Sequence, residues 1–348
     1  MLKYIYNLAT DKSSGFLPDL NKFILFLLSI VYGVIIRTIS FFLGLKLWQA
    51  KCKVISVGNI TLGGTGKTPL VEYLAKALKL KNKKVAVITR GYRKTAKLKS
   101  GDEALMLEEN LRDVPVIVDK DRIRAINRAC SKYGIDLVIL DDGFQQWKVK
   151  KDLDVVVIDA TNPFGNKHMI PRGILREPLS ALARADVFML TKVDLTDQAP
   201  QIKSFINKIN RRALIFESVH EAAGFTKFSQ KAQNIDKGYF SSKKVVLISG
   251  IGDPDSFEKT IRGLGVLVEH HFKFGDHYQY TQADLEKISR ELKNKDIAAV
   301  ITTVKDAVKL KGLDLKVLEK EVFVLEIRIK IIKDEERLFN RLFGLCGN

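Results

Sequence analysis

The sequence predicts an α/β protein with three parts: a core built on a mostly parallel sheet, a smaller C-terminal α/β lobe and an N-terminal hydrophobic helix. Short apolar, β-branched runs recur along the chain, and each ends in a polar or glycine turn. Helical patterns separate several of these runs, which is typical of parallel strands covered on both faces. A strongly apolar stretch precedes the first run.

The composition is that of a folded protein with anionic partners. The 348 residues leave room for one large α/β domain or two ordinary ones, and 46% hydrophobic against 28% charged residues excludes a disordered chain. The three cysteines are far apart, so neither a disulfide framework nor a zinc site is indicated. The net charge of +18 favours nucleic acid, acidic lipid or a phosphorylated substrate without choosing among them.

The apolar stretch covers residues 23–45 and begins with a clean run of 14 residues, which Arg37 interrupts. A transmembrane helix needs about 20 apolar residues, and burying Arg37 in a bilayer costs about 3 kcal/mol. We therefore expect a helix or hairpin that lies in the membrane interface. A transmembrane helix and a buried core helix are the alternatives, and a cleaved signal peptide fits poorly because no small-residue cleavage site follows.

The strand-like runs define the domains. Six of them precede residue 220: CKVISVGN, KVAVITRGY, VPVIVD, DLVILDDGF, DVVVIDA and DVFMLTKVD. The later ones are KVVLISGIG, VLVEHHFKFGDH, AAVITTVKDAV and VFVLEIRIKI. We expect an N-terminal membrane-associated segment over residues 1–50, a core over 51–229 and a C-terminal α/β lobe over 230–348, with the site in the cleft between the lobes.

The most informative motif is VISVGNITLGGTGKTPLVEYLAKAL, in which a strand runs into a glycine-rich turn and then a helix. Backbone N–H groups of such a P-loop and the helix dipole bind phosphates. The predicted binding residues are Gly63, Gly64, Thr65, Gly66, Lys67 and Thr68. Lys67 would reach the β- and γ-phosphates and Thr68 would bind Mg²⁺. The usual first glycine of this pattern is replaced by Thr61.

Carboxylates in two further blocks are candidate site residues. Asp141 and Asp142 end an apolar strand, where they serve either as turn formers or, beside a P-loop, as Mg²⁺ ligands. Asp102 and Glu103 open a predicted helix, where they cap it or where one accepts a hydroxyl proton. His277 follows Asp276 on a loop after a strand, a pair that is more often structural than catalytic.

The block LTKVD at 190–194 supports a rival hypothesis. A T-K-x-D sequence at a strand end resembles the guanine-reading motif of GTPases, so the alternative is a membrane-associated P-loop GTPase or assembly factor. A second such block, TTVKD at 302–306, lies in the C-terminal lobe, and both cannot read the same base.

Together these blocks resemble the tetraacyldisaccharide 4′-kinases, the lipid A 4′-kinases of Gram-negative bacteria. The resemblance covers nearly the whole chain in order: the hydrophobic helix, VGNITLGGTGKTP, TRGY, GDEALML, DDGFQ, PRGILREPLSAL, LTKVD, FGDHY and TTVKDAVKL. That family also lacks the leading P-loop glycine and has the LTK-x-D element, which favours a kinase over a GTPase.

The resemblance implies ATP- and Mg²⁺-dependent phosphorylation of the 4′-hydroxyl of tetraacyldisaccharide 1-phosphate, giving lipid IVA. It implies that Asp102 is the catalytic base and His277 its partner, and that Asp141 and Asp142 serve the metal, with Glu103 and Gln145 as weaker candidates. Phosphate clamps would be Arg122 and either Arg172 or Arg176. The expected partners are a glycolipid and a membrane surface, with no nucleic acid, for a monomer at the cytoplasmic face of the bacterial inner membrane.

The chain departs from the family pattern at three positions. Gln146 stands where a histidine usually follows DDGFQ, Tyr278 replaces a second histidine in FGDHY, and Val304 replaces a glutamate in the TTVKD block. The aspartate and histidine of the proposed pair are retained, so we expect the activity to be intact.

Overall fold

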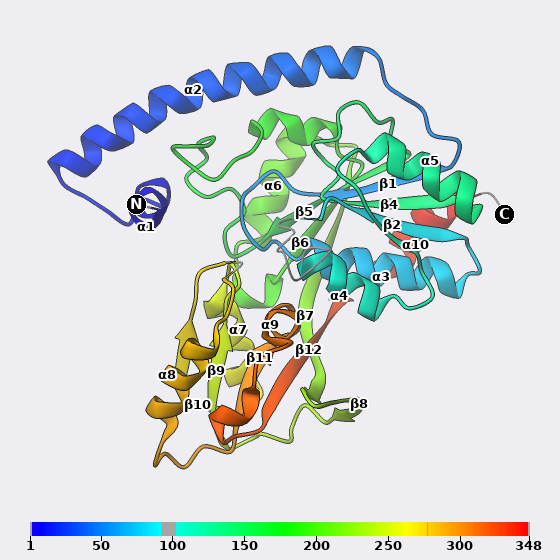
Figure 1. Ribbon diagram of the computed structural model, residues 1–348. Coiled ribbons are helices and arrows are strands. Elements are labelled where there is room, and N and C mark those ends of the chain that lie inside the picture. The colour runs from blue at the N-terminus through cyan, green and yellow to red at the C-terminus, as the bar shows by residue number, and fades with distance from the viewer. Residues whose placement is uncertain (1, 92–101, 277, 347–348) are drawn as a thin grey trace. The chain divides into compact units, whose positions relative to one another are not determined.

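A computed structural model describes residues 2–91, 102–276 and 278–346, and it confirms the α/β class (Figure 1). Its helices are α1 Leu2–Ala9, α2 Phe16–Leu45, α3 Lys67–Leu80, α4 Asp102–Asn110, α5 Arg122–Tyr133, α6 Ala199–Ile209, α7 Pro254–Gly263, α8 Gln282–Leu292, α9 Val304–Leu310 and α10 Glu335–Phe343. Its strands are β1 Lys53–Gly58, β2 Val85–Thr89, β3 Val116–Val118, β4 Leu137–Asp141, β5 Leu153–Asp159, β6 Val187–Thr191, β7 Leu214–Lys227, β8 Gln230–Ile235, β9 Lys244–Ser249, β10 Leu267–Lys273, β11 Ala299–Thr303 and β12 Val322–Ile331.

The described residues form two compact units. The first comprises those within 1–90, 111–219 and 331–348, and the second those within 91–110 and 220–330. Helix α4 therefore belongs to the second unit, although it lies between β2 and β3 in sequence. Strand β7 contributes its first residues to one unit and the remainder to the other.

The first unit contains a parallel sheet in the order β7-β6-β5-β1-β4-β2-β3. Strands β4 and β5 are buried at every residue, as expected for central strands with both faces covered. Because β1 lies between β4 and β5, the turn that follows β1 lies beside the carboxyl ends of both neighbours. Ligands of open parallel sheets bind at such strand ends.

The predicted strand runs are confirmed as β1 to β6 and β9 to β12, whereas β7 and β8 were missed. The sequence of β7, LIFESVHEAAGFTK, loses its alternation at the Ala-Ala-Gly segment, so no period indicates a strand. Helix α5 was also missed. It has clear end signals, because the Asp121 carboxylate accepts the Arg124 N–H and Gly134 ends the helix in the left-handed region.

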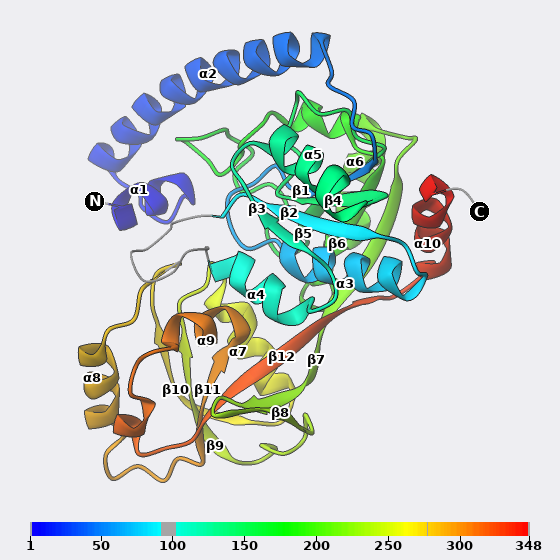
Figure 2. The same cartoon turned by 45° about the vertical axis from the view of Figure 1, so that its right-hand side comes forward.

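The N-terminal hydrophobic helix is confirmed and is longer than its apolar run. Helix α2 has 30 residues, starts at Phe16 and has Pro18 in its first turn, where proline is tolerated. It is drawn in blue above the first unit in Figures 1 and 2. Of its residues only Ser29 and Gly33 are buried. This exposure argues against the alternative of a buried core helix.

The second unit contains the parallel strand order β10-β9-β11-β12 and the antiparallel pair β7–β8. Helix α8 begins at a capping box in which Thr281 and Asp284 bond reciprocally. Helix α9 follows β11 directly and packs against α4, as Figure 2 shows. Thus the TTVKD block stands at a strand-to-helix junction of this unit.

Candidate active site

The P-loop joins β1 to α3, and its glycines occupy the backbone conformations that it requires. Gly63 has φ 113° and Gly66 has φ 87°, backbone angles that residues other than glycine rarely adopt. Gly66 is the residue before the first helical position, so the α3 N-terminus opens onto the loop at Lys67. This geometry favours phosphate binding by exposed backbone N–H groups.

Thr61 stands where the usual P-loop pattern has its first glycine, and its backbone contacts explain why a glycine is not needed there. It forms an isolated antiparallel bridge with Leu175, and the next residue, Leu62, donates its N–H to the Ile174 carbonyl at 2.8 Å. The Asn59 side-chain amide donates to the Thr61 carbonyl at 2.8 Å. This part of the loop is extended and paired, a conformation that a β-branched residue readily adopts.

The LTKVD block contacts the P-loop through Thr191. Its buried hydroxyl donates to the Thr65 carbonyl at 2.9 Å. Lys192 is also buried and forms an ion pair with Asp159 at 2.6 Å, whereas Asp194 is exposed. Thr191 therefore supports the loop from within the first unit. The Thr65 hydroxyl is buried without a hydrogen-bond partner among the described residues, and a bound phosphate would satisfy it.

Asp142 lies in a cluster of cations at the carboxyl end of β4. Arg176 Nη1 donates to both carboxylate oxygens at 2.9 Å, and Lys67 Nζ lies 3.6 Å from Oδ1. Burial alone raises the pKa of the Asp142 carboxyl, but Lys67 and Arg176 outweigh it and hold the pKa below its usual range. Asp142 is therefore ionised at neutral pH.

Asp141 and Arg122 lie deeper at the same strand end. The Asp141 side chain is buried and accepts the Thr89 hydroxyl at 3.2 Å. Arg122 is buried and donates from Nη2 to the Asp141 carbonyl at 3.3 Å. The structure thus brings both aspartates, Lys67 and Arg122 to one end of the sheet.

Arg172 and Arg176 are four residues apart but take different partners. Arg176 contacts Asp142, whereas Arg172 donates to Asp11 at 2.7 Å and to the Leu8 carbonyl at 3.2 Å. Arg172 therefore ties the N-terminal segment to the loop that precedes Arg176. Of the two candidate phosphate clamps, the structure places Arg176 at the P-loop.

Glu177 organises a buried network that the sequence did not reveal. Its side chain accepts hydrogen bonds from Gln145 at 2.9 Å, from Trp147 at 3.2 Å and from Arg184 at 2.9 Å. The Gln145 amide also donates to the Asn59 carbonyl at 2.9 Å. A glutamate between an arginine and a proline carries no sequence signal of burial, since Glu is rarely buried unless paired.

Gln145 is held by this network through its amide nitrogen. Its oxygen faces Arg176 at 3.5 Å. In this arrangement Gln145 links Glu177 and Asn59 to the cation cluster around Asp142.

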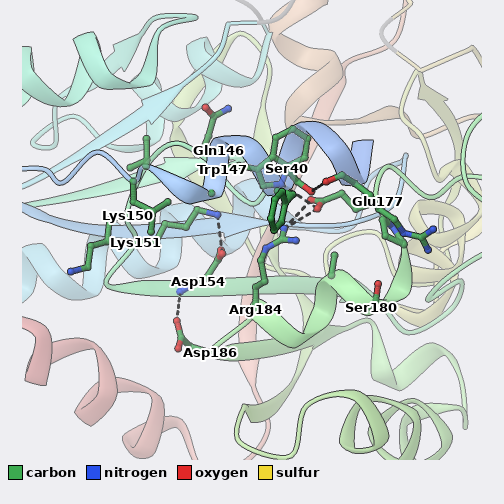
Figure 3. Close-up of a pocket in the computed structure, with 17 residues that line it drawn as sticks. Ser40, Gln146, Trp147, Lys150, Lys151, Asp154, Glu177, Ser180, Arg184 and Asp186 are labelled. Atoms are coloured by element: carbon green, nitrogen blue, oxygen red, sulfur yellow. Dashed lines mark hydrogen bonds and ion pairs between the residues drawn. The ribbon is translucent and has the colours of Figure 1, made fainter. Parts of the chain in front are cut away.

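A cavity of about 680 Å³ lies beside Glu177 in the first unit (Figure 3). Helix α2 contributes Arg37, Ser40, Phe41 and Gly44 to its lining. The opposite wall is formed by Gln146, Trp147, Lys150, Lys151, Asp154, Glu177 and Arg184, among others. Apolar walls with several cations suit an amphiphilic anion. Gln146, which replaces the usual histidine, faces this cavity.

The remaining predicted residues are in the second unit. Asp102 and Glu103 are the first residues of α4, but their side chains are not described, and His277 lies outside the described residues. Asp276, which precedes His277, forms an ion pair with Lys305 at 3.2 Å. The structure therefore describes residues next to the proposed Asp102–His277 pair but not the two side chains themselves.

No group of three or more His, Cys, Asp or Glu side chains is arranged to hold a metal within residues 2–91, 102–276 and 278–346, apart from the undescribed side chains. Mg²⁺ in kinases is typically bound by one or two carboxylates together with substrate phosphates and water. The oxygen donors Thr68, Asp141 and Asp142 lie at the P-loop end of the sheet and fit that mode.

Comparison with known proteins identifies relatives over nearly the whole chain. The family model described as tetraacyldisaccharide-1-P 4′-kinase matches residues 21–345. The curated tetraacyldisaccharide 4′-kinase of Halothermothrix orenii is 35% identical, with 97% of each chain covered. That of Desulfatibacillum aliphaticivorans is 35% identical, with 88% of each chain covered. The crystal structure of LpxK from Aquifex aeolicus in complex with ATP aligns with a TM-score of 0.70 and 28% identity, covering 91% of this chain and 97% of that one.

Proposed function

Because this chain belongs to the tetraacyldisaccharide 4′-kinase family, we propose from that premise how its own residues bind the two substrates and transfer the phosphoryl group. The enzyme uses ATP and Mg²⁺ to phosphorylate the 4′-hydroxyl of tetraacyldisaccharide 1-phosphate, which gives lipid IVA. The observation that carries the site assignment is the P-loop with its left-handed Gly63 and Gly66, which ends at Lys67 beside Asp142.

The phosphates of ATP are bound at the α3 N-terminus. Backbone N–H groups of residues 63–68 surround the β- and γ-phosphates, and the Lys67 ammonium exchanges its contact with Asp142 for phosphate oxygens. Arg176 donates to the same Asp142 carboxylate and supplies a second cation for the transferred phosphoryl group. Thr68, Asp141 and Asp142 would hold Mg²⁺, with Glu103 and Gln145 as further ligands, and the bound ion supplies positive charge to the phosphate oxygens.

Asp102 accepts the proton of the 4′-hydroxyl as that oxygen forms its bond to the γ-phosphorus. The bond between the γ-phosphorus and the bridging oxygen breaks, and ADP leaves. His277 orients the carboxylate through a hydrogen bond. A sugar hydroxyl is a weak nucleophile, so a positioned base contributes strongly to the rate. The α4 N-terminus, where Asp102 stands, is a favourable position for a carboxylate.

The cavity beside Glu177 accepts part of the lipid substrate, with Arg37 and Lys150 as cations for its anionic group. Phe41 and Trp147 supply apolar walls, and the Tyr32 hydroxyl of α2 donates to the Arg176 carbonyl at 3.1 Å. One hydrogen bond thus connects the lipid-facing helix to the residue that contacts Asp142. This contact supports an acceptor site that leads from the membrane toward the P-loop.

The double variant Arg37→Ala/Lys150→Ala should raise the KM for the lipid about fivefold or more, because exposed cations each contribute modestly. The KM for ATP should stay unchanged, since neither residue belongs to the P-loop. Steady-state kinetics with each substrate varied in turn measures both values. Lys148→Ala is the matched control, because Lys148 is exposed and does not line the cavity. An unchanged lipid KM in the double variant would place the acceptor elsewhere.

We also propose that α2 lies in the interface of the cytoplasmic face of the inner membrane. Among the described residues it is the one helix long and apolar enough to cross a bilayer, with a mean hydropathy of 2.2 over its most apolar window. One side of α2 packs against the rest of the first unit. There Gly33 lies close to the Met169 sulfur, and Phe26 packs edge-on against His168. The opposite side presents Leu27, Val31 and Val34, each about half exposed.

Replacing Leu27, Val31 and Val34 together by glutamine should weaken vesicle binding about 100-fold or more, because each apolar side chain contributes up to about 1.5–3 kcal/mol when buried. Flotation with vesicles of anionic phospholipid measures the partition. The control swaps Leu27→Val, Val31→Leu and Val34→Leu, which keep the surface apolar. Binding that survives the glutamine variant, together with resistance to carbonate extraction of the wild type, would instead support a transmembrane helix.

A further inference from the structure

The second T-x-K-D block, TTVKD, ends at Asp306, which forms a fully buried ion pair with Lys309 of the same helix. Lys309 Nζ lies 2.9 Å from Asp306 Oδ1, and both side chains have zero exposed surface. Removing two charges from water costs several kcal/mol, so such a pair is weak evidence for stability. The presence of this buried pair in α9 therefore needs an explanation other than stability.

Lys309 fixes α9 to the end of β9. Its ammonium also donates to the Gly250 carbonyl at 2.8 Å, and Thr303 caps the helix by accepting the Asp306 N–H at 3.1 Å. Gly250 is closely surrounded, because an added Cβ would lie 3.0 Å from the Tyr280 hydroxyl and 3.3 Å from both Asp306 Oδ1 and the Gly275 carbonyl. The buried pair is therefore packed directly against the loop that starts after β10.

That loop is tied to α9 and β9 by further contacts. The Phe274 N–H donates to the Ser249 carbonyl at 2.8 Å, and Lys305 of α9 pairs with Asp276 at 3.2 Å. Aromatic contacts join Phe274 to Tyr278 and Tyr280, with ring centroids 4.7 and 5.1 Å apart. Asp276 is the residue immediately before His277.

The other side of α9 packs against α4, the helix that begins at Asp102. An ion pair between Lys311 and Glu109 closes this contact. Helix α9 thus contacts both segments that carry the proposed catalytic pair. It packs against α4 (Figure 2), and its Lys305 pairs with Asp276 of the Phe274–Asp276 loop.

We propose that the buried Lys309–Asp306 pair is a positioning element that sets the placement of α4 relative to the Phe274–Asp276 loop, and so aligns Asp102 with His277. This inference rests on the proposed function. The pair acts through other residues and touches no substrate. A rigid connection is needed because an error of about 1 Å in the position of a catalytic group costs on the order of 100-fold in rate.

The test uses the full-length protein with Lys309→Met/Asp306→Asn, which removes both charges and leaves neither partner buried alone. The expected result is a 10- to 100-fold lower kcat with an unchanged KM for ATP. In a His277→Ala background the same double substitution should change kcat less than about threefold, because residues that act through one unit are not additive. A purely structural role would cost the same factor in both backgrounds.

Arg328→Met/Glu221→Gln is the control, because this ion pair joins β12 to β7 in the same unit and belongs to neither α4, α9 nor the loop. It should leave kcat unchanged. Should the buried-pair variant fail to fold, Lys305→Ala removes the partly exposed contact with Asp276 and keeps the buried pair. Its loss of kcat should likewise vanish in the His277→Ala background.

The outcomes separate the inference from the proposed function. If Asp102→Ala and His277→Ala abolish activity while the Lys309–Asp306 and Lys305 variants retain the wild-type kcat, the positioning role is wrong and the catalytic pair stands. If Asp102→Ala and His277→Ala retain the wild-type kcat, the catalytic pair is wrong, and the positioning role is wrong with it.

Discussion

Lys67→Ala should lower kcat by at least two to three orders of magnitude, about 3–4 kcal/mol of transition-state stabilisation. Lys67 is the first residue of α3, its side chain is 13% exposed, and its ammonium lies within 3.6 Å of Asp142. No other lysine occupies the P-loop, so the substitution removes the charge that faces the β- and γ-phosphates. Asp142 keeps Arg176 as a partner, and the fold should therefore survive.

The measurement is initial-rate kinetics at saturating ATP and lipid. Lys76→Ala is the matched control on the same helix, where Lys76 is exposed and pairs with Glu72. That control should retain the wild-type kcat. Turnover near the wild-type value in Lys67→Ala would show that this loop does not bind the transferred phosphate.

Asp102→Ala and His277→Ala should each lower kcat by about 10²- to 10⁴-fold, the usual contribution of a general base. ATP affinity should change little, because both residues lie outside the P-loop. The double variant should be little worse than the more damaging single one, since members of a catalytic unit are not additive. Isothermal titration with a non-hydrolysable ATP analogue gives the affinity, and kcat comes from saturating kinetics.

His270→Ala controls for the loss of a histidine near the same loop. His270 lies on β10, is exposed and has no assigned role. Losses that multiply in the Asp102→Ala/His277→Ala variant would show that the two residues act independently. Retained activity in Asp102→Ala alone would remove that carboxylate as the base.

The sequence predicted the parts of the site that depend on local structure. A turn with Gly63 and Gly66 in the left-handed region can be read from glycine spacing between a strand and a helix. The positions of Asp141 and Asp142 follow from the end of a continuous apolar strand. In each case the residues that set the geometry are neighbours in sequence.

The parts that depend on distant segments were not predictable. Arg172 and Arg176 occupy the same motif, but Arg176 contacts Asp142 and Arg172 contacts Asp11. The backbone pairing of residues 60–62 with residues 174–176, which lies next to Arg176, joins segments far apart in sequence. Glu177 is buried because Gln145, Trp147 and Arg184 donate hydrogen bonds to it. No pattern in the sequence predicts these three contacts.

The same limit applies to the N-terminus and to the second unit. The apolar run predicted a helix, but the start of α2 at Phe16 and the whole of α1 lie before that run, where hydropathy gives no signal. The TTVKD block resembles a base-reading motif in sequence, whereas its Asp306 side chain is fully buried against Lys309 in the unit that contains β9 and β10.

The most direct measurement of the central claim is the product of the purified full-length protein incubated with tetraacyldisaccharide 1-phosphate, Mg²⁺ and ATP. Mass spectrometry should show a lipid that has gained one phosphate, NMR should place that phosphate on the 4′-oxygen, and GTP should replace ATP poorly. Lys67→Ala serves as the blank. Consumption of nucleotide without a bisphosphorylated lipid, or a clear preference for GTP, would contradict the account.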